Sequence, residues 1–323
     1  MEALRRSFPD VEITRATSRE DFEAVIGGAE IIFSWAPGEA AMAKASQLRW
    51  LHAPAAGVGA YLTPSFRKSG AIITNSRGAH AIPISEHVLG MLIALTRRLR
   101  AAIVEQTTTR MRRENWWVGS HVPDELHGKT LGLFGYGAIG REIARRAQGF
   151  GMKIVALRRN PKAVPDWDPE LLRALGLPME EPRLDDVMGS DEFPRFLGQS
   201  DAVVVCAALT PETLGAFHGK AFARMKRGAL FINVGRGKIV REEDLVEAVR
   251  GGHLGGAALD VFESEPLPEA SPLYTLENVI LTPHVSGLSH GFWPRAMALF
   301  RANLVRYAGG LPLLNRVDPE RGY

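Results

Sequence analysis

A glycine-rich segment near the middle of the chain has the residue types and spacing of a phosphate-binding turn. Residues 135–140 match the pattern G-x-G-x-x-G, after the apolar run 131–134 and before residues 141–150, which have helical periodicity. The first glycine of such a turn permits the tight bend, the second lets the backbone approach a pyrophosphate, and the third lets the helix pack on the strand. The segment therefore predicts a dinucleotide site formed by Gly135, Tyr136, Gly137, Ala138, Ile139 and Gly140. A purely structural glycine turn is the alternative.

The end of the next apolar run, residues 153–157, decides which dinucleotide is favoured. An acidic residue about 20 positions after the glycines holds the ribose 2′-hydroxyl of NAD, whereas arginine accommodates the 2′-phosphate of NADP. Arg158 and Arg159 stand at this position. Guanidinium groups bind phosphate in a bidentate manner, whereas a carboxylate would repel it. We therefore predict NADPH as the preferred cofactor and NADH as a second one, with a solvated basic loop as the alternative.

The elements that must position these residues are apolar runs that alternate with segments of helical period. Nine runs are typical of buried strands: residues 29–35, 48–53, 71–74, 130–134, 153–157, 202–207, 229–234, 256–259 and 279–282. Such alternation favours α/β architecture with parallel sheets, and nine strands are too many for one sheet of usual size. We expect two Rossmann-like or flavodoxin-like domains with the active site in the cleft between them. Residues 1–96 with 290–323 would form the substrate domain, and residues 97–289 the dinucleotide-binding domain.

Two further segments connect these elements. Residues 84–113 have helical period, with Ser85 as a candidate N-cap, and are expected to carry the chain from one domain into the other. Residues 160–200 are rich in proline and charge, which predicts a solvated insertion of short helices and loops without a strong strand. The acidic pairs Glu180-Glu181 and Asp185-Asp186 lack a coordinating frame, so no metal site is expected.

Composition excludes several classes of protein. The 323 residues carry a formal net charge of only +3, which gives no reason to expect a nucleic acid partner. No apolar stretch approaches the roughly 20 residues that span a bilayer, and residues 1–6 lack the apolar core of a signal peptide. The single cysteine, Cys206, lies in an apolar run and is expected to be a buried strand residue. A cytoplasmic protein is the default expectation.

Several motifs around the glycine turn, in the same order along the chain, resemble the D-isomer-specific 2-hydroxyacid dehydrogenase family. In the second half they are residues 127–130, 209–213, 225–229, 233–237, 258–266 and 282–287. Residues 55–58, 74–78 and 85–87 extend the resemblance, less distinctively, to the first half. The similarity therefore covers nearly the whole chain and implies an NAD(P)-dependent oxidoreductase that acts on the CH–OH group of small 2-hydroxy acids, or reduces 2-oxo acids.

The resemblance implies a catalytic set of Arg236, Glu265 and His284. Arg236 would hold the substrate oxygens in a fixed orientation, and His284 would donate a proton to the carbonyl oxygen during reduction. Glu265 would hydrogen-bond the imidazole and fix its tautomer. Each residue has a structural alternative, as a strand cap, a solvated acid or a turn residue, but all three follow apolar runs, where α/β sheets place their ligands.

The same resemblance implies further contacts. Asp260 would lie near the nicotinamide carboxamide, and residues 209–211 would line the adenosine side. The implied cofactor residues beyond the glycine turn and the arginines are Ala208, Leu209, Thr210, Pro211, Val234, Gly235, Asp260, His284, Ser286 and Gly287. The backbone amides of Ala56, Gly57 and Val58 would receive the substrate carboxylate, with Arg236 and His284 as the other substrate contacts; a tight turn after a strand is the alternative for these amides.

Two features bear on assembly and on the start of the chain. In this family the long helical region commonly joins two subunits, and Trp116 and Trp117 near its end are large apolar surfaces, so we expect a homodimer. Family members usually begin with a strand before the helix that residues 2–8 are expected to form. The sequence leaves open whether the start is truncated or the first domain lacks that strand.

The leading hypothesis is an NADPH-preferring reductase of glyoxylate, hydroxypyruvate or a related 2-oxo acid. One alternative is a dehydrogenase of another small anion, such as formate or phosphite, although Glu265 stands where the formate pattern has glutamine. The other is a regulatory, corepressor-like protein that binds the dinucleotide as a signal. Trp50, His80 and Trp293 are candidates for choosing among substrates, whose identity the sequence does not reveal.

Overall fold

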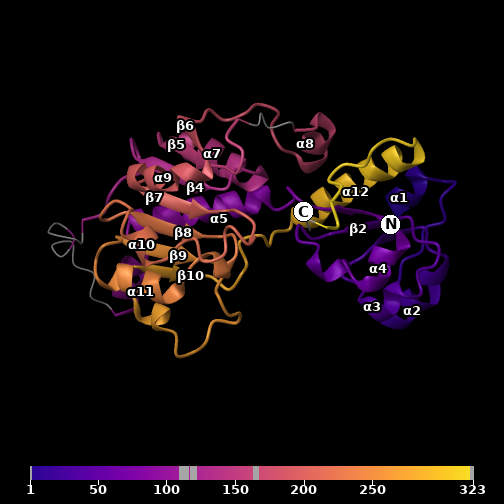
Figure 1. The fold of residues 1–323 in the computed structure, drawn as a ribbon, viewed down its shortest axis with the longest axis horizontal. Coiled ribbons are helices and arrows are strands. Elements are labelled where there is room, and N and C mark those ends of the chain that lie inside the picture. The colour runs from indigo at the N-terminus through magenta and orange to yellow at the C-terminus, as the bar shows by residue number, and fades with distance from the viewer. Residues whose placement is uncertain (1, 109–115, 117–121, 163–166, 321–323) are drawn as a thin grey trace. The chain divides into compact units, whose positions relative to one another are not determined.

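The computed structural model describes residues 2–108, 116, 122–162 and 167–320, and its contacts divide the chain into two units (Figure 1). The first unit comprises Met1–Ala79, Asp166–Met179 and His290–Tyr323, and the second comprises His80–Pro165 and Glu180–Ser289. The C-terminal crossing lies between residues 289 and 290. The first crossing lies between residues 79 and 80 rather than 96 and 97, because helix α5 (Ala81–Thr96) packs within the second unit.

The first unit is built on a parallel sheet in the order β1 (Ile31–Phe33), β2 (Trp50–Ala53) and β3 (Ile72–Asn75). All four residues of the central strand β2 are buried. The helices of this unit are α1 (Glu2–Ser7), α2 (Arg19–Val25), α3 (Glu39–Met42), α4 (Pro64–Ser69), α8 (Pro169–Leu175) and α12 (Phe292–Ala308). Parallel strands end at one edge of the sheet, so the segments after Phe33, Ala53 and Asn75 share that edge.

The second unit contains a seven-stranded parallel sheet, which Figure 1 shows with its helices. The order is β10-β9-β8-β7-β4-β5-β6, so the strand order reverses between β4 and β7. In doubly wound sheets, ligands bind outside the carboxyl ends of the strands at such a reversal. The strands are β4 (Thr130–Phe134), β5 (Lys153–Leu157), β6 (Asp186–Met188), β7 (Ala202–Val205), β8 (Leu230–Asn233), β9 (Gly256–Leu259) and β10 (Val279–Leu281).

Side chains alternate between the two faces of this sheet, and each face has its own apolar core. Val203 and Val205 of β7 pack with residues of α9 (Phe193–Gln199), α10 (Gly219–Phe222) and α11 (Glu242–Arg250). Ala202 and Val204 of the same strand pack with residues of α5 and α7 (Ala138–Gln148). Fully burying a leucine- or valine-sized side chain contributes about 1.5–3 kcal/mol. The strands are thereby fixed between two helical layers, with only their ends available for chemistry.

The two parallel sheets confirm the predicted fold class, and all nine predicted strands are present. Strand β6 is an addition to the prediction, because its three residues include a charged one and form no apolar run. The helical region after residue 84 also differs from the prediction. It begins earlier, at Ala81, and is interrupted at Arg98, whose backbone is left-handed (φ 54°), before α6 (Leu99–Thr107). Residues 109–113 of the predicted stretch lie outside the described residues.

Ser85 is not the N-cap that the sequence indicated. Its side chain is buried within α5, and its hydroxyl donates to the carbonyl oxygen of Ile82 (2.7 Å), one turn back inside the helix. His80 occupies the N-cap position and caps no backbone N–H with its side chain. None of the described helices is long and apolar enough to cross a membrane.

The insertion after β5 is not simply solvated, because its helix α8 belongs to the first unit. Asp168 caps the helix by accepting from the backbone N–H groups of Glu170 and Leu171, and Gly176 ends it in a left-handed conformation. Leu171, Leu172 and Leu175 are buried, and Arg306 of α12 forms an ion pair with Glu170 (2.5 Å). The chain thus leaves the second unit after β5 and returns to it before β6.

Candidate active site

The glycine turn lies at the carboxyl end of β4, where the strand order reverses. Gly135 has φ +99°, and a β-carbon there would lie 2.8 Å from the Cα of Ala207. A β-carbon at Gly140 would lie 2.8 Å from the carbonyl oxygen of Gly135. Gly137, the N-cap of α7, differs from both, since no atom lies within 4 Å of the position of its β-carbon. Gly135 and Gly140 therefore serve the fold. Gly137 borders open space, as the approach of a pyrophosphate requires.

Hydrogen bonds from neighbouring segments hold the glycine turn in place. The Cys206 thiol donates to the carbonyl oxygen of Gly135 (3.0 Å), and burial raises the pKa of this thiol to about 12. The Tyr136 hydroxyl donates to a carboxylate oxygen of Glu181 (3.2 Å). The Arg141 guanidinium, fully buried behind the turn, binds the same carboxylate through Nε (3.1 Å). Glu181, which lies between α8 and β6, thus binds both Tyr136 of the turn and Arg141, the first residue after the turn.

Both predicted phosphate-binding arginines follow β5 at the same edge of the sheet. The Arg158 guanidinium lies 5.8 Å from the centre of the Tyr136 ring. The charge of Arg159 reaches Glu212 in the loop after β7, where hydrogen bonds from Thr210 and the backbone, together with that charge, hold the pKa of Glu212 below its usual value. The side chains after β4, β5 and β7 therefore meet around the glycine turn, as a dinucleotide site requires.

The loop after β7 is organised by Thr213. Its hydroxyl accepts from the backbone N–H of Thr210 (2.8 Å) and donates to the carbonyl oxygen of Ala208 (2.8 Å). Leu209 is exposed within this turn, and Pro211 is exposed after it. The three residues predicted to line the adenosine side, 209–211, therefore lie with Ala208 in one surface segment beside the glycine loop.

His284 and Glu265 form a close pair beyond the ends of β9 and β10. The Nδ1 atom of His284 lies 2.7 Å from a carboxylate oxygen of Glu265. Burial opposes ionisation of Glu265, but hydrogen bonds from His284 and from the backbone N–H of Phe262, with the charges of His284 and Arg236, outweigh it and lower the pKa of Glu265. An ionised carboxylate can only accept, so Nδ1 carries the hydrogen. The side chain of His284 is 51% exposed.

Arg236 follows β8 and lies close enough for its charge to act on Glu265. Its guanidinium donates to the carbonyl oxygen of Gly235 (2.7 Å), and the Asn233 side chain donates to the carbonyl oxygen of Arg236 (3.1 Å). A β-carbon on Gly237 would overlap the carbonyl group of Phe262, so only glycine lets these two loops touch. The structure thus brings Arg236, Glu265 and His284 to one edge of the sheet, the edge that carries the glycine turn.

Asp260 lies under the loop that carries His284, with its side chain fully buried. One carboxylate oxygen accepts from the Thr282 hydroxyl (2.6 Å) and the backbone N–H of Val285 (2.9 Å), and the other accepts from the backbone N–H of Ser286 (3.0 Å). Three protein donors therefore already occupy the carboxylate that was predicted to face the nicotinamide. Val234, Gly235 and Ser286 are buried at the same edge.

The predicted carboxylate-binding loop belongs to the first unit, after β2. Ala56 and Gly57 are exposed, and Val58 is buried. The loop is fixed to the end of β3, since the Asn75 side chain donates to the carbonyl oxygen of Ala56 (2.6 Å) and the backbone N–H of Ser76 donates to that of Ala53 (3.0 Å). A fixed turn with small, exposed residues is suited to an anion that binds backbone amides.

The three candidate specificity residues separate in the structure. Trp50 is fully buried, with its indole N–H donating to the Thr74 hydroxyl (2.8 Å), so it offers no surface to a substrate. His80 belongs to the second unit and contacts the carbonyl oxygen of Gly287 through Nδ1 (3.0 Å). Trp293 is 46% exposed and stacks edge-on against Trp35, whose ring centre lies 6.0 Å away.

Two features were missed by sequence reasoning. Trp35, two residues beyond β1 and 53% exposed, stands at the same sheet edge as the loop after β2. The predicted strand 29–35 included this residue, and its aromatic type at the end of the run was an available signal. His52 is fully buried between the Thr74 and Ser76 hydroxyls (2.7 and 3.1 Å), and burial lowers its pKa to about 3. No pattern in the sequence marked His52, which is neutral and serves the fold.

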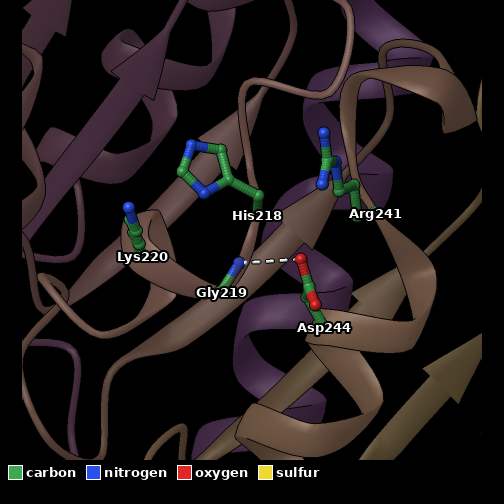
Figure 2. A pocket seen from close by; sticks show the side chains of 5 residues that line it. All are labelled: His218, Gly219, Lys220, Arg241 and Asp244. Atoms are coloured by element: carbon green, nitrogen blue, oxygen red, sulfur yellow. Dashed lines mark hydrogen bonds between the residues drawn. The ribbon is translucent and has the colours of Figure 1, made fainter.

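A surface pocket of about 420 Å³ is lined by none of the three catalytic candidates (Figure 2). It is lined by His218, Gly219, Lys220, Arg241 and Asp244. Figure 2 shows the backbone N–H of Gly219 donating to the Asp244 carboxylate (2.8 Å). This contact closes the first turn of α10 against α11, so the pocket is a junction between two helix starts rather than the catalytic site.

Comparison with known proteins agrees with this geometry. A model of the D-isomer specific 2-hydroxyacid dehydrogenase NAD binding domain matches residues 89–286, well over half of the chain. The chain belongs to the D-isomer specific 2-hydroxyacid dehydrogenase family. A glyoxylate reductase of Korarchaeum cryptofilum is 33% identical over 78% of the chain and 71% of its own length. This confirms the predicted family and its enzyme class, the NAD(P)-dependent oxidoreductases that act on CH–OH groups.

Other relatives differ in length or in the ligands of their structures. A Bacillus subtilis D-3-phosphoglycerate dehydrogenase is 33% identical over 78% of the chain. The matched region covers only 43% of the length of that relative. A solved family member from Aeromonas salmonicida has a TM-score of 0.81 and 33% identity, with 98% of this chain and 95% of that one covered. An NADPH-dependent glyoxylate/hydroxypyruvate reductase from Sinorhizobium meliloti, in complex with NADP and sulfate, has a TM-score of 0.79 and 27% identity, with 100% and 95% covered.

Proposed function

We propose that this dehydrogenase is an NADPH-preferring reductase of a small 2-oxo acid, of the glyoxylate or hydroxypyruvate type. The observation that carries the proposal is the pairing of His284 Nδ1 with Glu265 at 2.7 Å, beside Arg236 and at the sheet edge that bears the glycine turn. The relatives named glyoxylate reductase and the NADPH-dependent glyoxylate/hydroxypyruvate reductase support the substrate class.

In the proposed reaction, a reduced nicotinamide held by the glycine turn would supply the hydride that the carbonyl carbon of the 2-oxo acid accepts. His284 donates the proton on Nε2 to the carbonyl oxygen, so that the product is a 2-hydroxy acid. Glu265 accepts from Nδ1 of His284, which fixes the ring and stabilises its charged form before the transfer. Arg236 holds the substrate oxygens through its planar guanidinium, and the amides of residues 56–58 bind the carboxylate.

The cofactor would be held by the glycine turn through its pyrophosphate and by Arg158 and Arg159 through the 2′-phosphate. Two cations at the end of β5, and no carboxylate there, favour NADPH over NADH. The turn at residues 208–211 would contact the adenosine side. Val234, Gly235, Asp260, Ser286 and Gly287 would border the nicotinamide, with Asp260 acting mainly through the loop that it holds.

We also propose a homodimer, for which α6 offers a surface. Leu99, Ile103 and Val104 on this helix are 43%, 59% and 53% exposed, although all three are large and apolar. Trp116 is half-buried and donates through its indole N–H to Glu105 of the same helix (3.0 Å); Trp117 lies outside the described residues. A dimeric mass by light scattering at micromolar concentration is expected, and a monomeric mass would contradict the assembly.

The catalytic assignment is tested by His284→Gln and Glu265→Gln, each compared with the unsubstituted enzyme. Loss of the proton donor should lower kcat for reduction about 10²- to 10⁴-fold in His284→Gln. Glu265→Gln keeps a hydrogen-bond acceptor without the charge, so its loss should be smaller. NADPH affinity should stay within about twofold in both variants. Near-normal turnover of His284→Gln would remove this residue from the mechanism.

A further inference from the structure

The loop that carries His284, residues 282–287, is held at both ends by histidines of one helix. At its start, Nε2 of His87 lies 3.0 Å from the Thr282 hydroxyl. At its end, Nδ1 of His80 lies 3.0 Å from the carbonyl oxygen of Gly287. His80 precedes the first residue of α5 and His87 lies two turns further on, on the same side of the helix. The chemistry described above uses neither histidine.

The donor and the acceptor of each hydrogen bond between His87, Thr282 and Asp260 follow from the groups involved. The Thr282 hydroxyl oxygen lies 2.6 Å from the Asp260 carboxylate, and a carboxylate accepts, so Thr282 gives its single hydrogen to Asp260. The hydroxyl oxygen must then accept from His87, whose Nε2 carries the hydrogen. Nε2 of His87 also lies 3.9 Å from the Asp260 carboxylate. His87, Thr282 and Asp260 therefore form one directed chain that ends beneath the catalytic loop.

Asp260 is the point at which this chain meets His284. Its backbone carbonyl accepts from the backbone N–H of His284 (2.9 Å), and its carboxylate holds the N–H groups of Val285 and Ser286. His284 has a left-handed backbone conformation (φ +54°), which is unfavourable for a non-glycine residue. A strained conformation persists only where its surroundings hold it. The position of the His284 ring thus depends on how firmly Asp260 is fixed.

We propose that His87 is a positioning residue for proton transfer, acting through Thr282 and Asp260 on the loop that carries His284. The proposal rests on the proposed function of His284 and extends it to a residue of α5. His87 is well placed for this role because it is only 23% exposed and its helix is packed against the sheet. The chain also enters α5 directly from the first unit, so this helix begins at a crossing between the units.

The test compares His87→Leu, which removes the donor, with His87→Gln, whose amide nitrogen can take the place of Nε2. We expect kcat to fall about tenfold to a hundredfold in His87→Leu, since small displacements of a catalytic group have effects of this size. His87→Gln should recover most of the activity. The dissociation constant of NADPH and the KM for the 2-oxo acid should change less than kcat in both variants, because His87 is not among the residues proposed to contact either ligand.

Thr282 supplies a second pair of variants that keeps the test decisive if His87→Leu fails to fold. Thr282→Val removes the hydroxyl without changing the shape, and Thr282→Ser retains it. Thr282→Val should lose activity like His87→Leu, and Thr282→Ser should not. In the double variant His87→Leu/Thr282→Val the loss should not exceed that of the worse single variant, because both act through one chain. Multiplied losses would overturn the proposal.

A readout without turnover separates this proposal from the proposed function. In ¹³C-histidine-labelled protein without substrate, the ring signal of His284, one of nine histidines, can be assigned with His284→Gln. The proposal expects this signal to shift in His87→Leu and Thr282→Val and to stay in place in His87→Gln and Thr282→Ser. An unmoved signal with unchanged kcat would overturn it. A shifted signal in an enzyme that reduces no 2-oxo acid would uphold the positioning and refute the proposed reaction.

Discussion

Replacing Gly137 by alanine should abolish tight cofactor binding without harming the fold, whereas the same change at Gly135 should harm the fold. No atom lies within 4 Å of a β-carbon at Gly137, and its backbone angles (φ −109°, ψ −157°) are open to alanine. Alanine also restricts the unfolded chain, which favours the folded state by about 0.4–1 kcal/mol. The melting temperature of Gly137→Ala should therefore equal or slightly exceed that of the unsubstituted protein.

The effect on binding follows from the same open space. A methyl group at Gly137 would occupy the volume that the pyrophosphate needs in order to reach the backbone N–H groups of α7. Overpacking of this kind costs about 1–3 kcal/mol. Since 1.4 kcal/mol corresponds to a tenfold change, the dissociation constant of NADPH should rise between about fivefold and a hundredfold.

Gly135→Ala is the matched control. Its β-carbon would lie 2.8 Å from the Cα of Ala207, and the backbone has φ +99°, so strain of about 1–2 kcal/mol adds to overpacking of about 1–3 kcal/mol. At about 2–4 °C per kcal/mol for a domain of this size, the melting temperature should fall by at least several degrees. Calorimetry and NADPH fluorescence titration measure both effects. Unchanged NADPH affinity in a stable Gly137→Ala protein would refute the assignment of the pyrophosphate to this turn.

Three other substitutions or treatments test separate parts of the site. Replacing Arg158 and Arg159 by serine should raise KM for NADPH about tenfold or more and leave KM for NADH nearly unchanged, as two lost phosphate contacts require; equal changes for both cofactors would refute the 2′-phosphate assignment. Because the pKa of Glu265 is lowered in the folded protein, its carboxylate adds stability above its unfolded pKa of about 4.3, and that stability is lost as the pH falls through the lower folded pKa. The difference in melting temperature between the unsubstituted protein and Glu265→Gln should therefore shrink from pH 7 towards pH 3, and a constant difference would contradict the shift. Because burial raises the pKa of Cys206 to about 12, N-ethylmaleimide at pH 7.5 should leave the native protein unlabelled and label it in urea.

The sequence was sufficient for the parts of the fold that rest on local pattern. Apolar runs located nine strands, and the G-x-G-x-x-G spacing located the turn at the reversal of strand order. Strand β6 was beyond this reasoning, because Asp186 begins it and only three residues pair with β5. A short helix was expected where α8 lies, but its burial was beyond this reasoning, since the apolar side of the helix packs within the first unit, far away in sequence.

Part of the candidate site could likewise be predicted from the sequence, and part could not. Arg236, Glu265 and His284 could be named because they lie in motifs that resemble those of the family, and each also follows a strand whose end lies at one edge of the sheet. The support beneath them could not be predicted, because a contact between His87 and Thr282 spans 195 residues and has no local signature. Trp50 illustrates the opposite error: its type suggested a binding surface, but its place on the central strand of the first unit buries it completely.

The most direct test of the proposed function is turnover of a panel of 2-oxo acids, including glyoxylate and hydroxypyruvate, with NADPH and with NADH. Loss of nicotinamide absorbance reports the hydride transfer itself. We expect measurable reduction of at least one small 2-oxo acid and a higher kcat/KM with NADPH than with NADH. His284→Gln should retain only a small residual rate of turnover. Tight NADPH binding without reduction of any acid in the panel would contradict the proposal.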